Sequence, residues 1–182
     1  MTQDVLWITE DYVKDNTILN ENIDWRLAQP ILILVQDQYI HPILGTALFD
    51  EIADEIYANS VSANNQTLLD RYIRKTIMWY LLSELVPILK YRMRNKGVMT
   101  SNSENSQPAT LEEIQKLQSD FKNKAEWYAE MCTKFLRENS STYTNYFANT
   151  VNSDDLVPNG NNFTSSIFLD DNCDECKKNL YK

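Results

Sequence analysis

Glycine, histidine and cysteine are scarce in this sequence, and each shortage excludes a class of functional site. Three glycines among 182 residues leave no glycine-rich loop of the kind that cradles phosphate groups. The single histidine, His41, allows neither a His-x-x-x-His zinc pair nor a Glu-x-x-His di-iron motif. A Gly-x-Ser-x-Gly nucleophile elbow is also absent. We therefore expect a protein that is not an enzyme and that carries no cofactor.

The cysteines do not form an obvious framework. Cys132, Cys173 and Cys176 are an odd number in a chain without a secretory signal, which argues against structural disulfides. Cys173 and Cys176 have the spacing of a zinc knuckle or a redox pair. A knuckle needs a second ligand pair, which neither Cys132 nor His41 supplies, and a redox motif normally lies in a βαβ unit. They stay the candidates for a metal site, and purified protein without stoichiometric zinc would remove them.

Long apolar runs and basic leaders are missing too, so we expect no membrane span and no signal peptide. The protein should be made and kept in a cytoplasm. With 43% apolar residues it can form one domain that buries about 70% of the surface of its unfolded chain. The formal charge of −9 and the pI near 4.6 weigh against a general nucleic-acid binder, which needs Lys and Arg to neutralise phosphates.

Apolar residues recur at helical spacing through residues 1–150, which predicts an all-α fold, a helical bundle of about four main helices. Thr9, followed by two acidic residues, is typical of a helix cap and predicts a short helix over Tyr12 and Val13. Trp7 is expected in the core.

The densest apolar run, residues 31–35, is interpreted as helical because its flanks are polar and Pro30 would remove a donor from a central strand. The predicted helix begins near Asp24, with Asn22 or Asp24 as its cap, and buries a face that contains Leu27, Ile31, Leu34 and Val35. His41 and Pro42 should end it, since the residue before proline is disfavoured in the α conformation.

Gly45 lies where a tight-turn residue is expected. Thr46 should cap the next helix, residues 47–57. Together with the preceding helix, this makes a helical hairpin with a short corner.

The longest predicted helix covers residues 67–95, and Tyr72 and Trp79 widen its apolar surface beyond one stripe. It is either the central helix of the bundle or a helix that buries its second face, with Tyr72 and Trp79, against a neighbouring subunit. Pro87 should kink it.

Four basic residues end this helix before Gly97, the expected C′ residue: Lys90, Arg92, Arg94 and Lys96. They either interact with the helix dipole or contact an acidic neighbour or DNA.

After a Ser/Asn-rich loop over residues 98–109, Thr110 and Glu113 form a capping-box pattern. The helix that follows should run to about Glu138. One amphipathic face is expected to be buried, and it includes Leu111, Leu117 and Cys132.

The composition changes at Val151, where Asn, Ser and Asp begin to dominate. Residues 151–182 cannot bury enough surface to fold alone. Two interpretations are open: a disordered tail, or an extended arm that lies along the domain or a neighbouring protein. In the second, Ile167, Phe168 and Leu169 are the anchors.

The N-terminal third carries a resemblance. An Asn-x-Asp start, an early proline in an apolar helix and a corner pattern together resemble the head-tail connector (neck ring or adaptor) proteins of tailed bacteriophages, including crAss-like phages of Bacteroides-type hosts. The corner pattern is Ile40-x-Pro42-Ile43-Leu44-Gly45-x-x-Leu48-Phe49. Later helices match in order and length only.

The resemblance implies a structural virion protein in the phage neck that assembles as a ring matched to the twelvefold portal. Its partners would be further copies of itself, the portal protein and adjacent neck or tail proteins, and DNA would pass through without specific binding. The acidic charge would then help DNA to slide, or it simply keeps the protein in solution. The alternative function is a small acidic helical binding module that regulates a host or phage protein.

Overall fold

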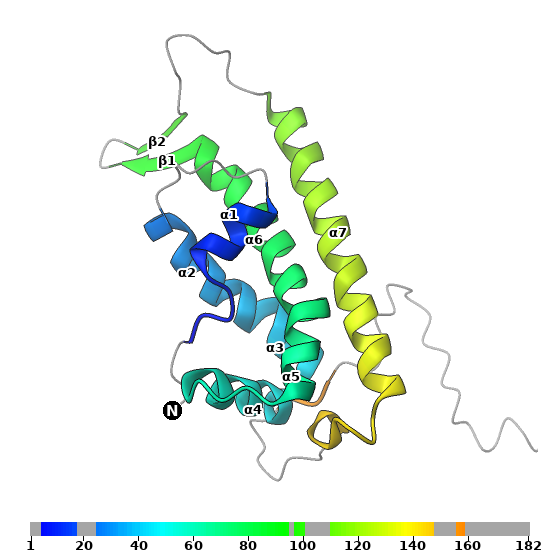
Figure 1. Cartoon of the computed structure of the whole chain (residues 1–182). Helices are drawn as coiled ribbons and strands as arrows, with labels where there is room; N and C mark the ends of the chain where they lie inside the picture. The colour runs from blue at the N-terminus through cyan, green and yellow to red at the C-terminus, as the bar shows by residue number, and fades with distance from the viewer. Residues whose placement is uncertain (1–4, 18–24, 95–96, 101–109, 148–155, 159–182) are drawn as a thin grey trace, which may run out of the picture.

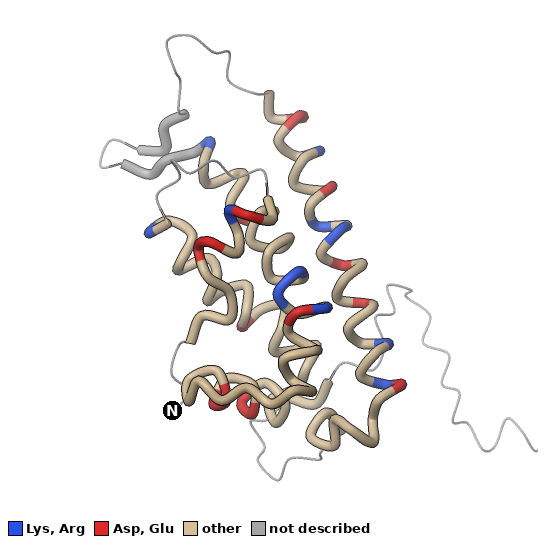
Figure 2. Tube along the Cα trace, in the orientation of Figure 1, with Lys and Arg blue, Asp and Glu red and all other residues tan. Residues whose placement is uncertain are grey.

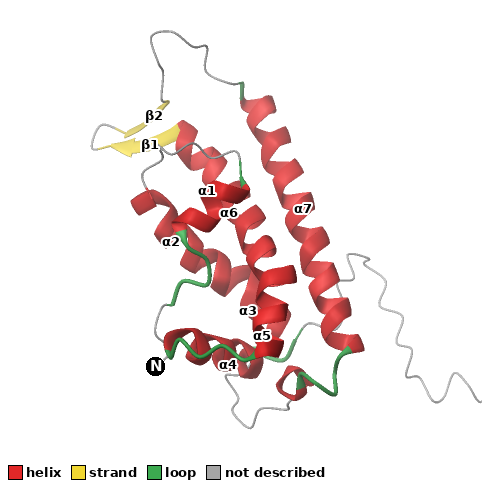
Figure 3. Cartoon of the chain, in the orientation of Figure 1, coloured by secondary structure: helices red, strands yellow, loops and turns green. Residues whose placement is uncertain are grey.

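The computed structural model describes residues 5–17, 25–94, 97–100, 110–147 and 156–158, with only the backbone described at 91–94 and 97–100. Helices make up most of these residues, and the all-α prediction is confirmed apart from one small hairpin (Figures 1 and 3). The N-terminal helix α1 (Glu10–Asn16) begins at the predicted cap, where the Thr9 side chain accepts a hydrogen bond from the Tyr12 N–H. No helix in the described part of the chain is long and apolar enough to cross a membrane.

The second helix continues past the residues that were expected to stop it. Helix α2 (Trp25–Val35) leads through a π-helical segment, η1 (Gln36–Ile40), into α3 (His41–Leu44). Proline in a helix normally clashes with the carbonyl four residues earlier. The wider turn of η1, closed by a hydrogen bond from the His41 N–H to the Gln36 carbonyl, lies directly before Pro42. It gives the proline ring room, so the predicted stop at His41 and Pro42 is wrong and the helix ends at Gly45.

The buried face of α2 also differs from the prediction. Leu27 and Leu34 are exposed, by 38% and 51%, whereas Ala28 and Leu32 are buried. Gln36, a polar residue, is 4% exposed. Its side chain accepts from the Trp7 N–H at 3.0 Å and donates to the Val5 carbonyl at 2.9 Å, and this holds Trp7 in the core as predicted.

The long central helix is shifted towards the N-terminus. It begins at α5 (Ala63–Leu68), capped by Ser62, and passes through a second π segment, η2 (Leu69–Ile73), into α6 (Arg74–Lys90). The predicted range of 67–95 is therefore wrong at both ends. Strands β1 (Tyr91–Arg94) and β2 (Gly97–Thr100) follow as an antiparallel hairpin, so Gly97 opens a strand and is not a helix C′ residue.

Helix α7 (Leu111–Glu138) confirms the capping box, because the side chains of Thr110 and Glu113 each bond the other residue's backbone N–H. It runs side by side with α6 (Figure 1). Cys132 is buried as expected, but Leu111 and Leu117 are exposed by 53% and 39%. The described chain continues to the 3-10 turn η3 (Thr144–Phe147).

The core forms around α6, which packs against α2 and η1 on one side and α7 on the other. Of the two interpretations of the long helix, the central position is the observed one. Its fully buried apolar side chains include Ile77, Leu81 and Leu85. Helix α4 (Thr46–Tyr57) lies across the end of the bundle, joined to α3 at Gly45 (Figure 1).

Candidate functional site

The predicted interface residues lie at separate places. Tyr72 and Trp79 are partly buried and face α7, where Tyr72 packs on Phe135 (ring centroids 5.0 Å apart) and Trp79 on Phe121 (5.7 Å). Lys90 is the last residue of α6, and Arg92 and Arg94 lie in β1. The arm anchors Ile167, Phe168 and Leu169 and the metal candidates Cys173 and Cys176 lie outside the described residues. Within those residues no cluster of three or more His, Cys, Asp or Glu side chains could hold a metal.

The corner between α3 and α4 depends on one glycine. Gly45 has φ 74° and ψ 160°, a backbone region that is essentially restricted to glycine. Its N–H donates to the His41 carbonyl and closes α3. The expected cap, Thr46, instead begins α4, and Gly45 itself occupies the cap position.

A segment from the far end of the chain is seated on this corner. The Thr46 N–H donates to the Leu156 carbonyl at 2.9 Å, and the Leu156 N–H donates to Thr46 Oγ1 at 2.8 Å. A β-carbon on Gly45 would lie 2.6 Å from Pro158 Cδ and 3.0 Å from the Leu156 oxygen. Glycine is therefore needed both for the turn and for the close approach of residues 156–158.

His41 links the corner to the core. Its Nε2 atom lies 2.9 Å from Thr46 Oγ1, the same hydroxyl that accepts from Leu156. The imidazole ring stacks on Phe49 at 4.7 Å, and Phe49 in turn packs on Trp7 at 4.7 Å. The only histidine is thus a corner residue that connects the seated segment with the core.

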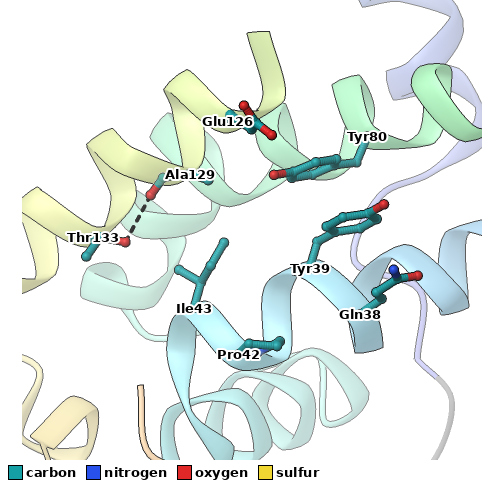
Figure 4. A pocket seen from close by; sticks show the side chains of 8 residues that line it. All are labelled: Gln38, Tyr39, Pro42, Ile43, Tyr80, Glu126, Ala129 and Thr133. Atoms are coloured by element: carbon teal, nitrogen blue, oxygen red, sulfur yellow. Dashed lines mark hydrogen bonds between the residues drawn. The ribbon is translucent and has the colours of Figure 1, made fainter. Parts of the chain in front are cut away.

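A pocket of about 180 Å³ opens beside the same corner, between η1, α3, α6 and α7 (Figure 4). Tyr39 and Tyr80 stack almost parallel, with ring centroids 3.9 Å apart, and the Tyr39 hydroxyl donates to Glu84 at 2.8 Å. Glu126 and Ile43 also line the pocket. Its wall therefore includes two aromatic rings, the carboxylate of Glu126 and the apolar side chain of Ile43. Thr133 also lines the pocket, and its hydroxyl donates to the Ala129 carbonyl at 3.1 Å. These groups can bind a side chain of a partner.

The comparisons with known proteins place the corner inside a family. A family model described as a family of unknown function, DUF6712, matches residues 40–155, which is more than half of the chain. The chain belongs to the DUF6712 family. Neither a curated protein nor a solved structure matches it. The DUF6712 match includes the whole corner pattern from Ile40 to Phe49 and ends directly before the seated segment.

Burial changes the titration of the pocket tyrosines in this DUF6712 member. Desolvation, and then the hydrogen bond to Glu84, raises the pKa of Tyr39 from 10.0 to about 12. Desolvation, followed by the negative charge of Glu126, raises the pKa of Tyr80 to about 12 as well. Both phenols therefore keep their protons to a higher pH than an exposed tyrosine does.

This perturbation predicts an alkaline loss of stability. Between pH 10 and about pH 12 the unfolded phenols release protons that the folded phenols keep, so the free energy of unfolding falls as the pH rises. Chemical denaturation at a series of pH values up to 11.5 measures this slope, and Tyr80→Phe should make it shallower. Tyr57→Phe is the matched control, because Tyr57 is 64% exposed. Equal slopes in both variants would contradict a role for the stacked pair.

Proposed function

We propose that this protein is a structural component of a tailed-phage particle that forms a ring in the neck, joins the portal to the tail and continues the DNA channel. The observation that carries the proposal is the corner. The residues that resemble connector proteins, from Ile40 to Phe49, fold into a fixed helical turn that holds the start of the C-terminal arm. Such a turn sets the point from which an arm leaves the domain.

The distribution of exposed apolar side chains also supports a ring. Leu34 on α2 is 51% exposed and Trp127 on α7 is 55% exposed, and these two helices lie on different sides of α6 (Figure 1). A cyclic ring uses a heterologous interface, in which one surface of each subunit binds a different surface of the next. Apolar residues on two sides of one subunit fit that requirement.

Charge is consistent with the channel role. Acidic and basic residues are interspersed along the helices (Figure 2), and the chain is acidic overall, with a formal charge of −9. An acidic wall repels the phosphate backbone and favours sliding over sticking. In such a ring, the channel wall would consist of the residues that face its inner side.

Truncation tests the role of the arm. A chain that ends at Pro158 keeps the seated segment but loses Ile167, Phe168 and Leu169, so it should stay helical and fail to enter particles. We expect incorporation to fall at least about tenfold, equivalent to a loss of about 1.4 kcal/mol of interface free energy. Quantitative mass spectrometry of particles from complemented infections measures it.

The matched control ends at Cys176, which keeps residues 167–169 and should be incorporated normally. Deletion from Val151 onward, which also removes Leu156 and Pro158, should behave like the chain that ends at Pro158. Normal incorporation of the folded Pro158 truncation would overturn the role of the arm.

A further inference from the structure

A second surface, distant in sequence from the corner, has the chemistry of a docking site. Five residues on α6 and α7 form an aromatic–lysine patch: Lys75, Trp79, Lys124, Trp127 and Tyr128. Trp127 is 55% exposed and meets Tyr128 edge to face, with ring centroids 4.9 Å apart. An open hollow of about 240 Å³ lies against Trp127, Tyr128, Lys124 and Asn123.

Two ammonium groups border the aromatic rings. Lys124 Nζ lies 4.5 Å from the Trp79 ring centroid, and Lys75 Nζ lies 5.6 Å from the Tyr128 centroid. Within the described part of the chain, neither lysine forms an ion pair with a carboxylate, whereas nearby Glu126 and Glu130 pair with Lys122 and Lys134. The patch therefore presents positive charge in a chain whose formal charge is −9.

These features define the ligand. An exposed indole beside a hollow gains free energy when it buries a large apolar side chain, about 25 cal/mol per Å² of apolar surface. The two lysines favour a carboxylate next to that side chain. A segment with large apolar residues followed by acidic residues satisfies both requirements.

Residues 167–171 of this chain have that sequence, Ile-Phe-Leu-Asp-Asp. They also lie within reach. Ile167 lies nine positions after Pro158, a stretch that spans up to roughly 30 Å when extended. The corner that seats Pro158 adjoins α3, whose Ile43 lines a pocket together with Thr133 of α7. From Thr133 to Trp127 the helix rises only about 9 Å.

We propose that residues 167–171 dock on the aromatic–lysine patch of the same chain, with Phe168 against Trp127 and with Asp170 and Asp171 on Lys124 and Lys75. The seated segment at Gly45 fixes the origin of the arm, and the patch holds its apolar part. This docking covers apolar side chains in the isolated chain. It goes beyond the proposed function and does not depend on it.

Zero-length carbodiimide crosslinking of the full chain tests the proposal, because it joins an amine and a carboxylate only when they are in contact. An equal mixture of ¹⁴N-labelled and ¹⁵N-labelled chains separates crosslinks within a chain from those between chains. We expect Lys124 or Lys75 joined to Asp170 or Asp171, within single chains, at several times the yield of crosslinks from those aspartates to Lys134.

Variants make the test specific. Phe168→Ala and Trp127→Ala should each lower the yield severalfold, whereas Tyr57→Ala, which removes an exposed aromatic ring on α4, should not. Lys124→Glu should abolish the Lys124 crosslink. Adding Asp170→Lys and Asp171→Lys to this variant should restore a crosslink, now between an amine at position 170 or 171 and the carboxylate at position 124. A yield no higher than at Lys134, crosslinks only between chains, or no restoration would each overturn the proposal.

Discussion

Gly45→Ala should be among the most destabilising single substitutions in this protein, because Gly45 is buried against Leu156 and Pro158. The residue has φ 74° and ψ 160°, and a non-glycine residue in such a conformation costs about 1–3 kcal/mol. The new methyl group would also lie 2.6 Å from Pro158 Cδ and 2.8 Å from Cγ, and overpacking of this kind adds about 1–3 kcal/mol. We therefore expect a loss of about 2–6 kcal/mol in the free energy of unfolding.

Thermal melting is a sufficient measurement, because for a chain of this size each kcal/mol shifts Tm by about 2–4 °C. Adding Pro158→Gly to Gly45→Ala should recover only part of the loss, since the backbone strain and the Leu156 oxygen at 3.0 Å remain. Asn59, with φ 51° at the end of α4, gives a control in which the change in stability should have the opposite sign. Asn59→Gly should raise stability by less than about 1 kcal/mol. A Gly45→Ala protein that melts with the parent would show that the corner is not constrained as described.

Leu81→Ala should cost a comparable amount for a different reason. Leu81 is fully buried in the middle of α6, where the helix packs against α2 on one side and α7 on the other. Removing a buried leucine side chain leaves a cavity as well as lost burial, together worth about 2–5 kcal/mol. The two helices would have to move together to close this cavity, so we expect the upper half of that range.

Ile88→Ala is the matched control for this substitution. Ile88 lies on the same helix but is 41% exposed, so its truncation should cost less than about 1 kcal/mol. Urea denaturation of both variants gives the two values. Similar losses would mean that α6 is not held from both sides.

Local signals predicted much of the bundle. The Thr110–Glu113 capping box fixed the start of α7 because both residues act through their own neighbours. Gly45 was identified as a turn residue because few other residues adopt positive φ. The acidic turn after Thr9 marked α1 in the same way. Each of these signals acts within four residues, so one sequence is enough to detect it.

Features that depend on distant partners were missed. The π segments η1 and η2 were not predicted. The predicted face of α2 included Leu34, because helical spacing alone does not distinguish it from the observed face of Ala28, Ile31, Leu32 and Val35. Gln36 is buried because it satisfies the backbone of Val5 and Trp7. Asn65 is buried because Glu51 and Glu55 both accept from its side-chain amide.

The same distinction between local signals and distant partners applies to the candidate site. The sequence identified the corner through its glycine and its resemblance. The seat of Leu156 and Pro158 was not predictable, because it joins residues 110 apart in the chain. Trp79 was recognised as part of an apolar surface wider than one stripe. Its proximity to Lys124, and that of Lys75 to Tyr128, was not predicted, since only packing of α6 on α7 brings these residues together.

The central claim, a ring at the phage neck, is tested most directly by quantitative mass spectrometry of purified phage particles, with the portal protein as the internal standard. The account predicts that the protein is present at a copy number equal to the portal or a small whole multiple of it. Absence from the particle would contradict the account and would favour the small helical binding module, whose partner affinity capture from infected cells would then identify.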